Sequence, residues 1–186
     1  MRWLLILGVV TFALDTAAWL GLAFSQEREQ PPRDGPIERD KLLLAGWDPD
    51  EPVPAYAYYK KGNKGMSVVI FVHGLGGSKE QYVKQMQELA SKDLFVLTVD
   101  SHLHGERKIP GIIPQGKNLG GLGTDYSIWV HQSAISHTAR DISKIIDALS
   151  ARSDVDLSRI GIGGVSMGSS TCMVVAWREP SGPGTK

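Results

Sequence analysis

A serine with glycine two positions away on each side is the feature of this sequence best suited to nucleophilic chemistry. The stretch reads Gly164-Val165-Ser166-Met167-Gly168, between a run that favours a strand and a run that favours a helix. A serine at such a strand-to-helix turn takes a positive φ, and glycine best fits two residues before and after it. The turn would present the Ser166 hydroxyl at the carboxyl edge of a sheet. The Met167 N–H would begin a helix whose dipole favours negative charge, which is half of an oxyanion hole.

The five-residue pattern alone also fits a glycine-rich turn with an incidental serine, so the surrounding elements decide between the two interpretations. Strands are expected at 42–47, 53–59, 67–72, 94–99 and 160–165, and helices from 78, from about 136 and over 167–177. The runs 67–72 and 94–99 are continuously apolar, as in strands that a parallel sheet buries on both faces. The alternation predicts an α/β fold with a mainly parallel sheet and helices on both faces.

Three local signals refine this arrangement. Pro54 places the strand 53–59 close to a sheet edge, and Ser78 with Gln81 is typical of a helix capping box. The segment 101–129 is long, rich in glycine and without periodicity, which suits a rim or partial lid over a site.

Composition and charge narrow the functional classes. The 186 residues are 42% hydrophobic and 22% charged, which is typical of one globular domain with its own core. Lys and Arg total 20, as do Asp and Glu, so no net charge favours nucleic acid as a partner. Cys172 is the only cysteine, which excludes an intrachain disulfide, and we expect it to pack in the core.

The amino terminus resembles a secretory signal peptide. One arginine precedes the mostly apolar stretch 3–25, and Ala23 and Ser25 are the small residues that a signal peptidase reads before Gln26. The stretch is also long enough to remain as a membrane anchor, although Asp15 in its middle disfavours that. We therefore expect a secreted or periplasmic protein, with a membrane-anchored one as the alternative.

The chain accordingly divides into three parts. Residues 1–25 form the signal peptide or anchor. Residues 26–52 form a polar, proline-containing linker and a first strand. Residues 53–186 form the α/β domain.

Three features together resemble the α/β-hydrolase superfamily. A strand ends in His73-Gly74-Leu75-Gly76-Gly77, the next ends in Asp100 shortly before His104-Gly105-Glu106-Arg107, and Asp156 to Gly161 leads into the serine turn. Their order and spacing are similar to those of dienelactone-hydrolase and prolyl-oligopeptidase-like esterases. The resemblance covers 53–177.

The resemblance implies roles for the matched positions. Ser166 would be the nucleophile, and the Leu75 and Met167 N–H groups would form the oxyanion hole. His73 and Gly74 would form the turn that presents Leu75. The implied activity is that of an exported serine esterase acting on a small-molecule ester or acyl substrate, with no cofactor or metal.

One part of the family pattern is missing. In this fold the acid and the histidine follow the nucleophile, yet the residues after Ser166 include no histidine and only one acid, Glu179. We therefore expect the N-terminal half of a hydrolase fold, truncated after the serine turn, with the outer edge of the strand 160–165 open to association. A catalytically inactive fragment or binding module, and a peptidase or acyltransferase of the same fold, remain alternatives.

Upstream histidines could line the same edge. His102 and His104 follow the strand that ends at Asp100, so we expect them near Ser166, but no third ligand with metal-site spacing accompanies them. Asp100 and Arg107 are expected to hold the loop. Two further histidines are expected to be solvated or to flank a helix: His131 and His137.

Overall fold

The computed structural model describes residues 5–9, 35–112 and 125–178, and within them the strands form one six-stranded sheet. Its order is β1-β6-β4-β5-β3-β2. The strands are β1 (Leu5–Val9), β2 (Ile37–Leu44), β3 (Val53–Lys60), β4 (Met66–Val72), β5 (Leu94–Val99) and β6 (Val155–Val165). β1, β6, β4 and β5 are parallel, whereas β3 and β2 are each antiparallel to the strand beside them. The predicted mainly parallel α/β sheet is therefore confirmed.

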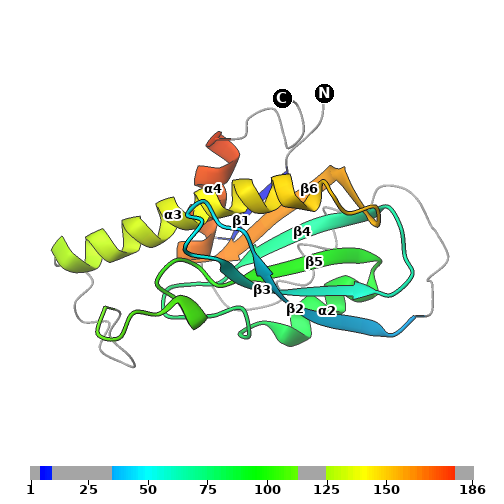
Figure 1. Ribbon diagram of the computed structural model, residues 1–186, viewed down its shortest axis with the longest axis horizontal. Coiled ribbons are helices and arrows are strands. Elements are labelled where there is room, and N and C mark those ends of the chain that lie inside the picture. Colours follow the sequence, from blue (N-terminus) through cyan, green and yellow to red (C-terminus); the bar gives the residue numbers. More distant parts are fainter. Residues whose placement is uncertain (1–4, 10–34, 113–124, 179–186) are drawn as a thin grey trace.

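Helices cover both faces of this sheet, as expected. They are α2 (Val83–Ser91), the short 3-10 helix η1 (Gly105–Arg107), α3 (Asp125–Leu149) and α4 (Met167–Arg178). Figure 1 shows α3 and α4 on one face and α2 on the other. The larger apolar core lies on the α3 and α4 side and contains Ile70, Ile142 and Val175. A smaller core on the α2 side contains Met86 and Val96.

Cys172 belongs to the larger core, as predicted. It is buried in α4, and this burial raises the pKa of its thiol to about 12. A thiol that stays protonated at neutral pH is a packing residue and not a nucleophile.

Three elements are clearly longer than their sequence patterns predict. β6 begins at Val155 and not at Ile160, so it takes in residues that were expected to form a loop. β2 begins at Ile37 and not at Leu42, because the whole strand pairs with β3 and places β3 second from the edge. α3 begins at Asp125 and not near Ser136, so it takes in the end of the segment predicted as a loop. Residues 113–124 of that segment lie outside the described residues.

The predicted helix cap at Ser78 is wrong. The N-cap of α2 is Tyr82, and no side chain caps this helix. Ser78 and Gln81 instead form a turn, in which the Gln81 N–H donates to the Ser78 carbonyl over 3.1 Å. The reason is that Lys79 is bound to Asp100, which holds this stretch in the loop before the helix.

The outer edge of β6 is covered, which corrects the expectation of an open edge. Leu5–Val9 pairs with residues 161–165 in parallel. The rest of the predicted leader and residues 26–34 of the predicted linker lie outside the described residues. None of the helices in the described ranges combines the length and the apolar character that a bilayer span requires.

Candidate active site

Ser166 lies at a strand-to-helix turn with the backbone conformation that its pattern predicts. β6 ends at Val165 and α4 begins at Met167, and between them Ser166 has a φ of 51°. Ser166 is exposed to solvent, whereas Met167 is buried. A non-glycine residue with positive φ costs on the order of 1–3 kcal/mol and persists only where the surroundings enforce it, as they do at many functional sites.

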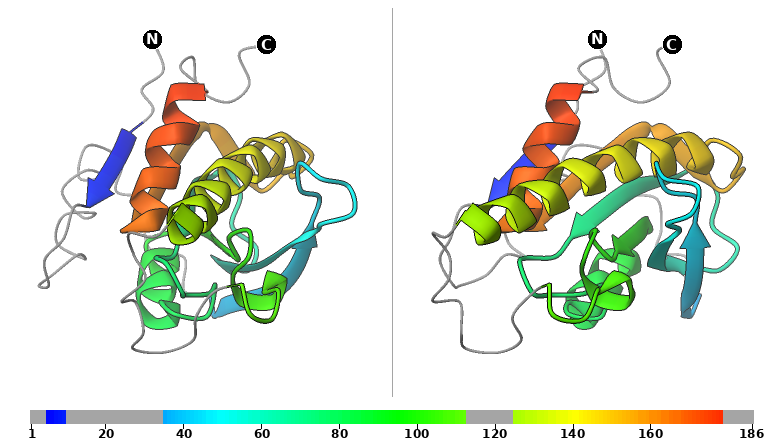
Figure 2. Two further views of the ribbon diagram at one scale, coloured as in Figure 1. Left: turned by 90° about the vertical axis from the view of Figure 1, so that its left-hand side faces the viewer. Right: turned by 60° about the vertical axis from the view of Figure 1, so that its left-hand side comes forward.

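Gly164 and Gly168 let α4 approach the sheet closely. A Cβ on Gly164 would lie 2.6 Å from the Gly168 carbonyl carbon and 2.7 Å from the Val72 oxygen. A Cβ on Gly168 would overlap the same Val72 oxygen and lie 2.8 Å from the His73 oxygen. A larger residue at either position would push the first turn of α4 away from the end of β4. Both views in Figure 2 place that first turn beside the segment between β4 and α2.

That segment brings its glycine-rich loop against the serine turn. A Cβ on Gly74 would lie only 3.7 Å from the Ser166 Cβ, so the two backbones adjoin. The Gly77 N–H donates to the Gly74 carbonyl over 3.0 Å and closes a turn around Leu75 and Gly76, where Gly76 has a φ of 74°. The proposed donor Leu75 therefore belongs to a compact loop next to the proposed nucleophile.

His73 holds the start of this loop through two hydrogen bonds of its ring. It is buried, its Nδ1–H donates to the Gly74 carbonyl over 2.7 Å, and its Nε2 accepts the Ser101 N–H over 3.1 Å. These two bonds require the neutral ring with its proton on Nδ1. Burial lowers the pKa of His73, which keeps the ring neutral at physiological pH.

Asp100 holds the end of the same loop. Its carboxylate accepts the Lys79 N–H over 2.8 Å, the Lys79 ammonium over 2.9 Å and the Glu106 N–H over 2.9 Å. Gly105, with a φ of 56°, passes so close that a Cβ there would overlap the carboxylate. Asp100 therefore joins the loop after β4 to the segment after β5.

Lys79 is a fully buried cation among carboxylates. The side chains of Lys79 and Asp100 are both 0% exposed, and the ammonium also contacts Glu80 and Glu106 at the protein surface. The Tyr56 ring lies 5.2 Å from the same ammonium. Burial alone would lower the pKa of Lys79, but the hydrogen bonds that its ammonium donates to the three carboxylates outweigh burial and hold this pKa above its ordinary value.

His104 lies on the side of the segment after β5 that faces His73. Its ring is fully buried 5.4 Å from the ring of His73, and its Nδ1–H donates to the His102 carbonyl over 2.9 Å. Burial lowers the pKa of His104 to about 4. Its Nε2 has no hydrogen-bond partner among the described residues.

His102 points to a different neighbourhood, against α3. Its Nδ1 lies 3.1 Å from the Glu51 carboxylate, and its ring stacks on His137 with centroids 4.3 Å apart. Burial lowers the pKa of His102, and His137 adds to this effect. The prediction that His137 is solvated or flanks a helix is wrong, because α3 carries it onto His102. In the part of the chain that is described, no group of three or more His, Cys, Asp or Glu could hold a metal ion.

Arg107 holds the loop after β5, as predicted, since it donates to the Asp100 carbonyl over 3.3 Å. Its side-chain partners have no signal in the sequence. Arg107 donates to Asp141 of α3 over 2.8 Å and to Glu51 over 3.3 Å, and Asp141 also accepts the Trp47 N–H over 2.9 Å. The ring of Trp47 meets that of His137 edge-on at 6.0 Å. The cluster ties the loop between β2 and β3 to α3.

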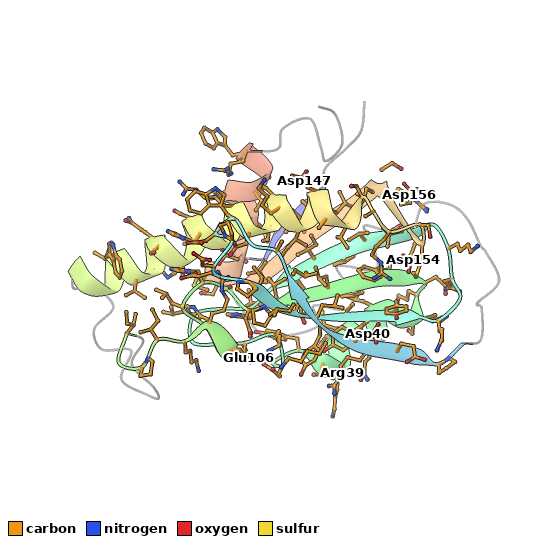
Figure 3. The ribbon with its side chains drawn as sticks, in the orientation of Figure 1. Arg39, Asp40, Glu106, Asp147, Asp154 and Asp156 are labelled. Carbon is orange, nitrogen blue, oxygen red and sulfur yellow. The ribbon has the colours of Figure 1, made fainter. Side chains whose placement is uncertain are left out.

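The hydrogen-bond partners that could activate the Ser166 hydroxyl are histidines and carboxylates. In the described ranges, the Ser166 hydroxyl makes no hydrogen bond to a histidine or a carboxylate. Figure 3 shows Glu106, which belongs to η1, far from Asp154 and Asp156, which lie where β6 begins. Glu179 lies outside the described residues.

Comparison with known proteins places the chain among hydrolases. A family model described as Phospholipase/Carboxylesterase matches residues 57–181. No curated protein sequence is detectably similar to the chain.

Solved structures of similar fold are longer than this chain. An acetyl xylan esterase from a Paenibacillus species has a TM-score of 0.58 and 22% identity, over 81% of this chain and 47% of its own. A hyperthermophilic esterase from Pyrobaculum calidifontis has a TM-score of 0.56 and 22% identity, over 80% and 42%. A dienelactone hydrolase-like promiscuous phosphotriesterase from metagenomic libraries has a TM-score of 0.59 and 20% identity, over 78% and 56%. At these identities the likeness shows the fold, and the chain spans about half of each structure.

Proposed function

This chain belongs to the phospholipase/carboxylesterase family, a branch of the α/β-hydrolases, and on that premise we propose that it carries the nucleophile and the oxyanion hole of an exported serine esterase. One observation supports this proposal above the others. Ser166 is an exposed hydroxyl residue with a φ of 51°, and it adjoins Gly74 of the loop that carries Leu75. The proposed export rests on the apolar stretch 3–25, whose residues Leu5–Val9 form β1 in the uncleaved chain and would leave the edge of β6 on cleavage.

The chemistry would follow the usual course of acyl transfer. The Ser166 Oγ attacks the carbonyl carbon of an ester, its proton passes to a general base, and the carbonyl oxygen becomes an oxyanion. The Leu75 and Met167 N–H groups would donate to that oxyanion, and the N-terminus of α4 would add its dipole. Collapse expels the alcohol and leaves an acyl group on Ser166, which water then removes. The base would be a histidine paired with an acid, neither of which the described residues supply at Ser166.

The substrate class proposed is a small carboxylic ester. The similar structures are named as an acetyl xylan esterase, an esterase and a dienelactone hydrolase-like enzyme, and those names describe the other proteins. A serine nucleophile with two backbone donors is the common requirement of ester chemistry, so the proposal does not depend on any one of these substrates.

A fluorophosphonate probe on the full chain tests the proposal directly. We expect the probe to add to Ser166, Ser166→Ala to abolish the addition, and Ser170→Ala, one turn further along α4, to leave it unchanged. Hydrolysis of p-nitrophenyl acetate should follow the same pattern. Absence of labelling, or equal labelling of Ser166→Ala, would show that this chain does not act as a serine hydrolase.

A further inference from the structure

The loop between β4 and α2 is fastened at both ends to two consecutive residues. His73, at its start, accepts the N–H of Ser101 over 3.1 Å. Lys79, at its end, binds the carboxylate of Asp100 through both its N–H and its ammonium, over 2.8 and 2.9 Å. Because Asp100 and Ser101 are adjacent and directly follow β5, the two ends of the loop are held at a single point of the chain.

Between these two points the loop has few restraints of its own. Gly74, Gly76 and Gly77 make up much of it, and glycine gives a chain more conformational freedom than any other residue. The hydrogen bond from the Gly77 N–H to the Gly74 carbonyl closes its turn. A loop of this composition stays in one conformation only if its ends are fixed.

The ion pair at the far end is costly to bury, which calls for a reason. Lys79 and Asp100 are both 0% exposed, and a buried pair of charges gives little net stability compared with apolar residues of similar volume. The geometry, however, is specific: one carboxylate accepts hydrogen bonds from the backbone and the side chain of Lys79 and from the backbone of Glu106. Such an arrangement fixes where two loops lie relative to each other.

We propose that Lys79 and Asp100 are positioning residues that hold the Leu75 loop against Ser166. This inference rests on the proposed function for the role of Leu75, but the fastening itself is a property of the loop and can be measured without turnover. It adds a structural lysine to a site in which the described residues proposed for the chemistry are the serine and the two residues that supply backbone amides.

The Gly77 amide reports on the loop, and hydrogen exchange of the full chain measures it. Lys79→Met removes the ammonium and leaves the Asp100 charge without its cation, so we expect Gly77 to exchange at least about tenfold faster. The matched control is Lys60→Met. Lys60 is also nearly buried, at 8% exposure, and pairs with Asp93 over 3.0 Å on another part of the sheet.

The control has its own reporter, which makes the comparison symmetrical. The Asn63 N–H donates to the Lys60 carbonyl over 3.3 Å, and its side chain binds Asp93. Lys60→Met should accelerate exchange at Asn63 and leave Gly77 unchanged, and Lys79→Met should do the reverse. If Gly77 exchanges at the wild-type rate in Lys79→Met, or accelerates only in step with global unfolding, the proposal is overturned.

A double variant separates positioning from simple charge balance. Lys79→Met with Asp100→Asn removes both charges, and it also provides a folded protein if Lys79→Met alone does not fold. If the pair positions the loop, Gly77 stays in fast exchange although global stability recovers. Wild-type exchange in the double variant would reduce the pair to charge compensation and refute the proposal.

Probe labelling of Ser166, measured alongside, keeps the two proposals apart. Slower labelling in Lys79→Met but not in Lys60→Met supports both. If the wild-type chain is not labelled at all, the proposed function fails while the exchange data still decide whether Lys79 and Asp100 fasten the loop.

Discussion

Two polar clusters flank the segment after β5, and they are built in opposite ways. The inner cluster joins Asp100 and Lys79, both with fully buried side chains, to the neutral rings of His73 and His104. The outer cluster centres on Glu51, whose side chain is 44% exposed. In the inner cluster, burial lowers the pKa of both histidines, whereas the carboxylate partners of Lys79 raise its pKa. In the outer cluster, Glu51 is partly solvated, although the ion pair between Arg107 and Asp141 is nearly buried. The segment after β5 therefore contacts a fully buried ion pair on one side and a partly solvated carboxylate on the other.

The difference has a physical basis in what each cluster would lose. A charge stranded at full burial is expensive because no water can replace the missing partner. Loss of the half-exposed Glu51 carboxylate strands no charge, because Arg107 keeps Asp141 as its partner and water can replace Glu51. Substitutions that leave one partner behind should therefore separate the two clusters clearly.

The largest effect is expected from Asp100→Ala. It leaves the ammonium of Lys79 buried without its fully buried partner and removes the acceptor of two backbone N–H groups, so unfolding should become easier by about 3–5 kcal/mol. Urea denaturation at pH 7 measures this loss.

Glu51→Ala is the control from the outer cluster. It should cost below about 1 kcal/mol, because Glu51 is partly solvated and Arg107 keeps its bond to Asp141. Equal losses for the two variants would contradict the contrast between the clusters.

Acid should destabilise the protein through the inner histidine. The pKa of His104 is lowered to about 4, below the value near 6.5 of an unfolded chain. Between these values the unfolded state binds the extra proton, so this contribution to stability is present above pH 6.5 and is lost as the pH falls towards 4, by about 3 kcal/mol in total.

Unfolding free energies measured between pH 7 and pH 4.5 test this expectation. His104→Phe, which cannot titrate, should flatten the dependence over that range. An equally steep decline in the variant would assign the acid sensitivity to other groups.

The smallest effects belong to the outer histidine and concern its titration. Burial and His137 both lower the pKa of His102, whereas Glu51 raises it. His137→Leu should therefore raise the pKa of His102 and Glu51→Gln should lower it, with stability changed by less than about 1 kcal/mol in each case. An NMR titration of the His102 ring measures both shifts. Shifts of the same sign in the two variants would refute this description of the outer cluster.

The sequence predicted best what depends on local pattern. β5 and the start of α4 have the predicted bounds, because a continuous apolar run and a glycine-flanked serine are local signals. The first residues of β2 and the first half of α3 were not predicted, because pairing along the full length of β3 and packing across the sheet determine them. The cap at Ser78 failed for the same reason, since the competing bond joins residues 21 positions apart.

In the candidate site, too, local features were predicted from the sequence and contacts between distant residues were not. The serine turn and its glycines are visible in five consecutive residues, and the backbone there has the expected φ. The contacts of Lys79 with Asp100 and of His102 with His137 are not visible in the sequence, because each joins residues from separate elements. Lys79 in particular follows a serine and precedes a glutamate, a context that suggests a solvated helix start.

The pairing of β4 with β5 determines where the two loops of the candidate site begin relative to each other. Val72 and Val99 are the last partners in that register, and His73 and Asp100 are the residues that follow them. The spacing of the two neighbouring strands therefore sets the distance between the two loops, and the loops themselves do not determine it. A change deep in the sheet that shifted this register by one position would misplace Leu75 without touching any residue near Ser166.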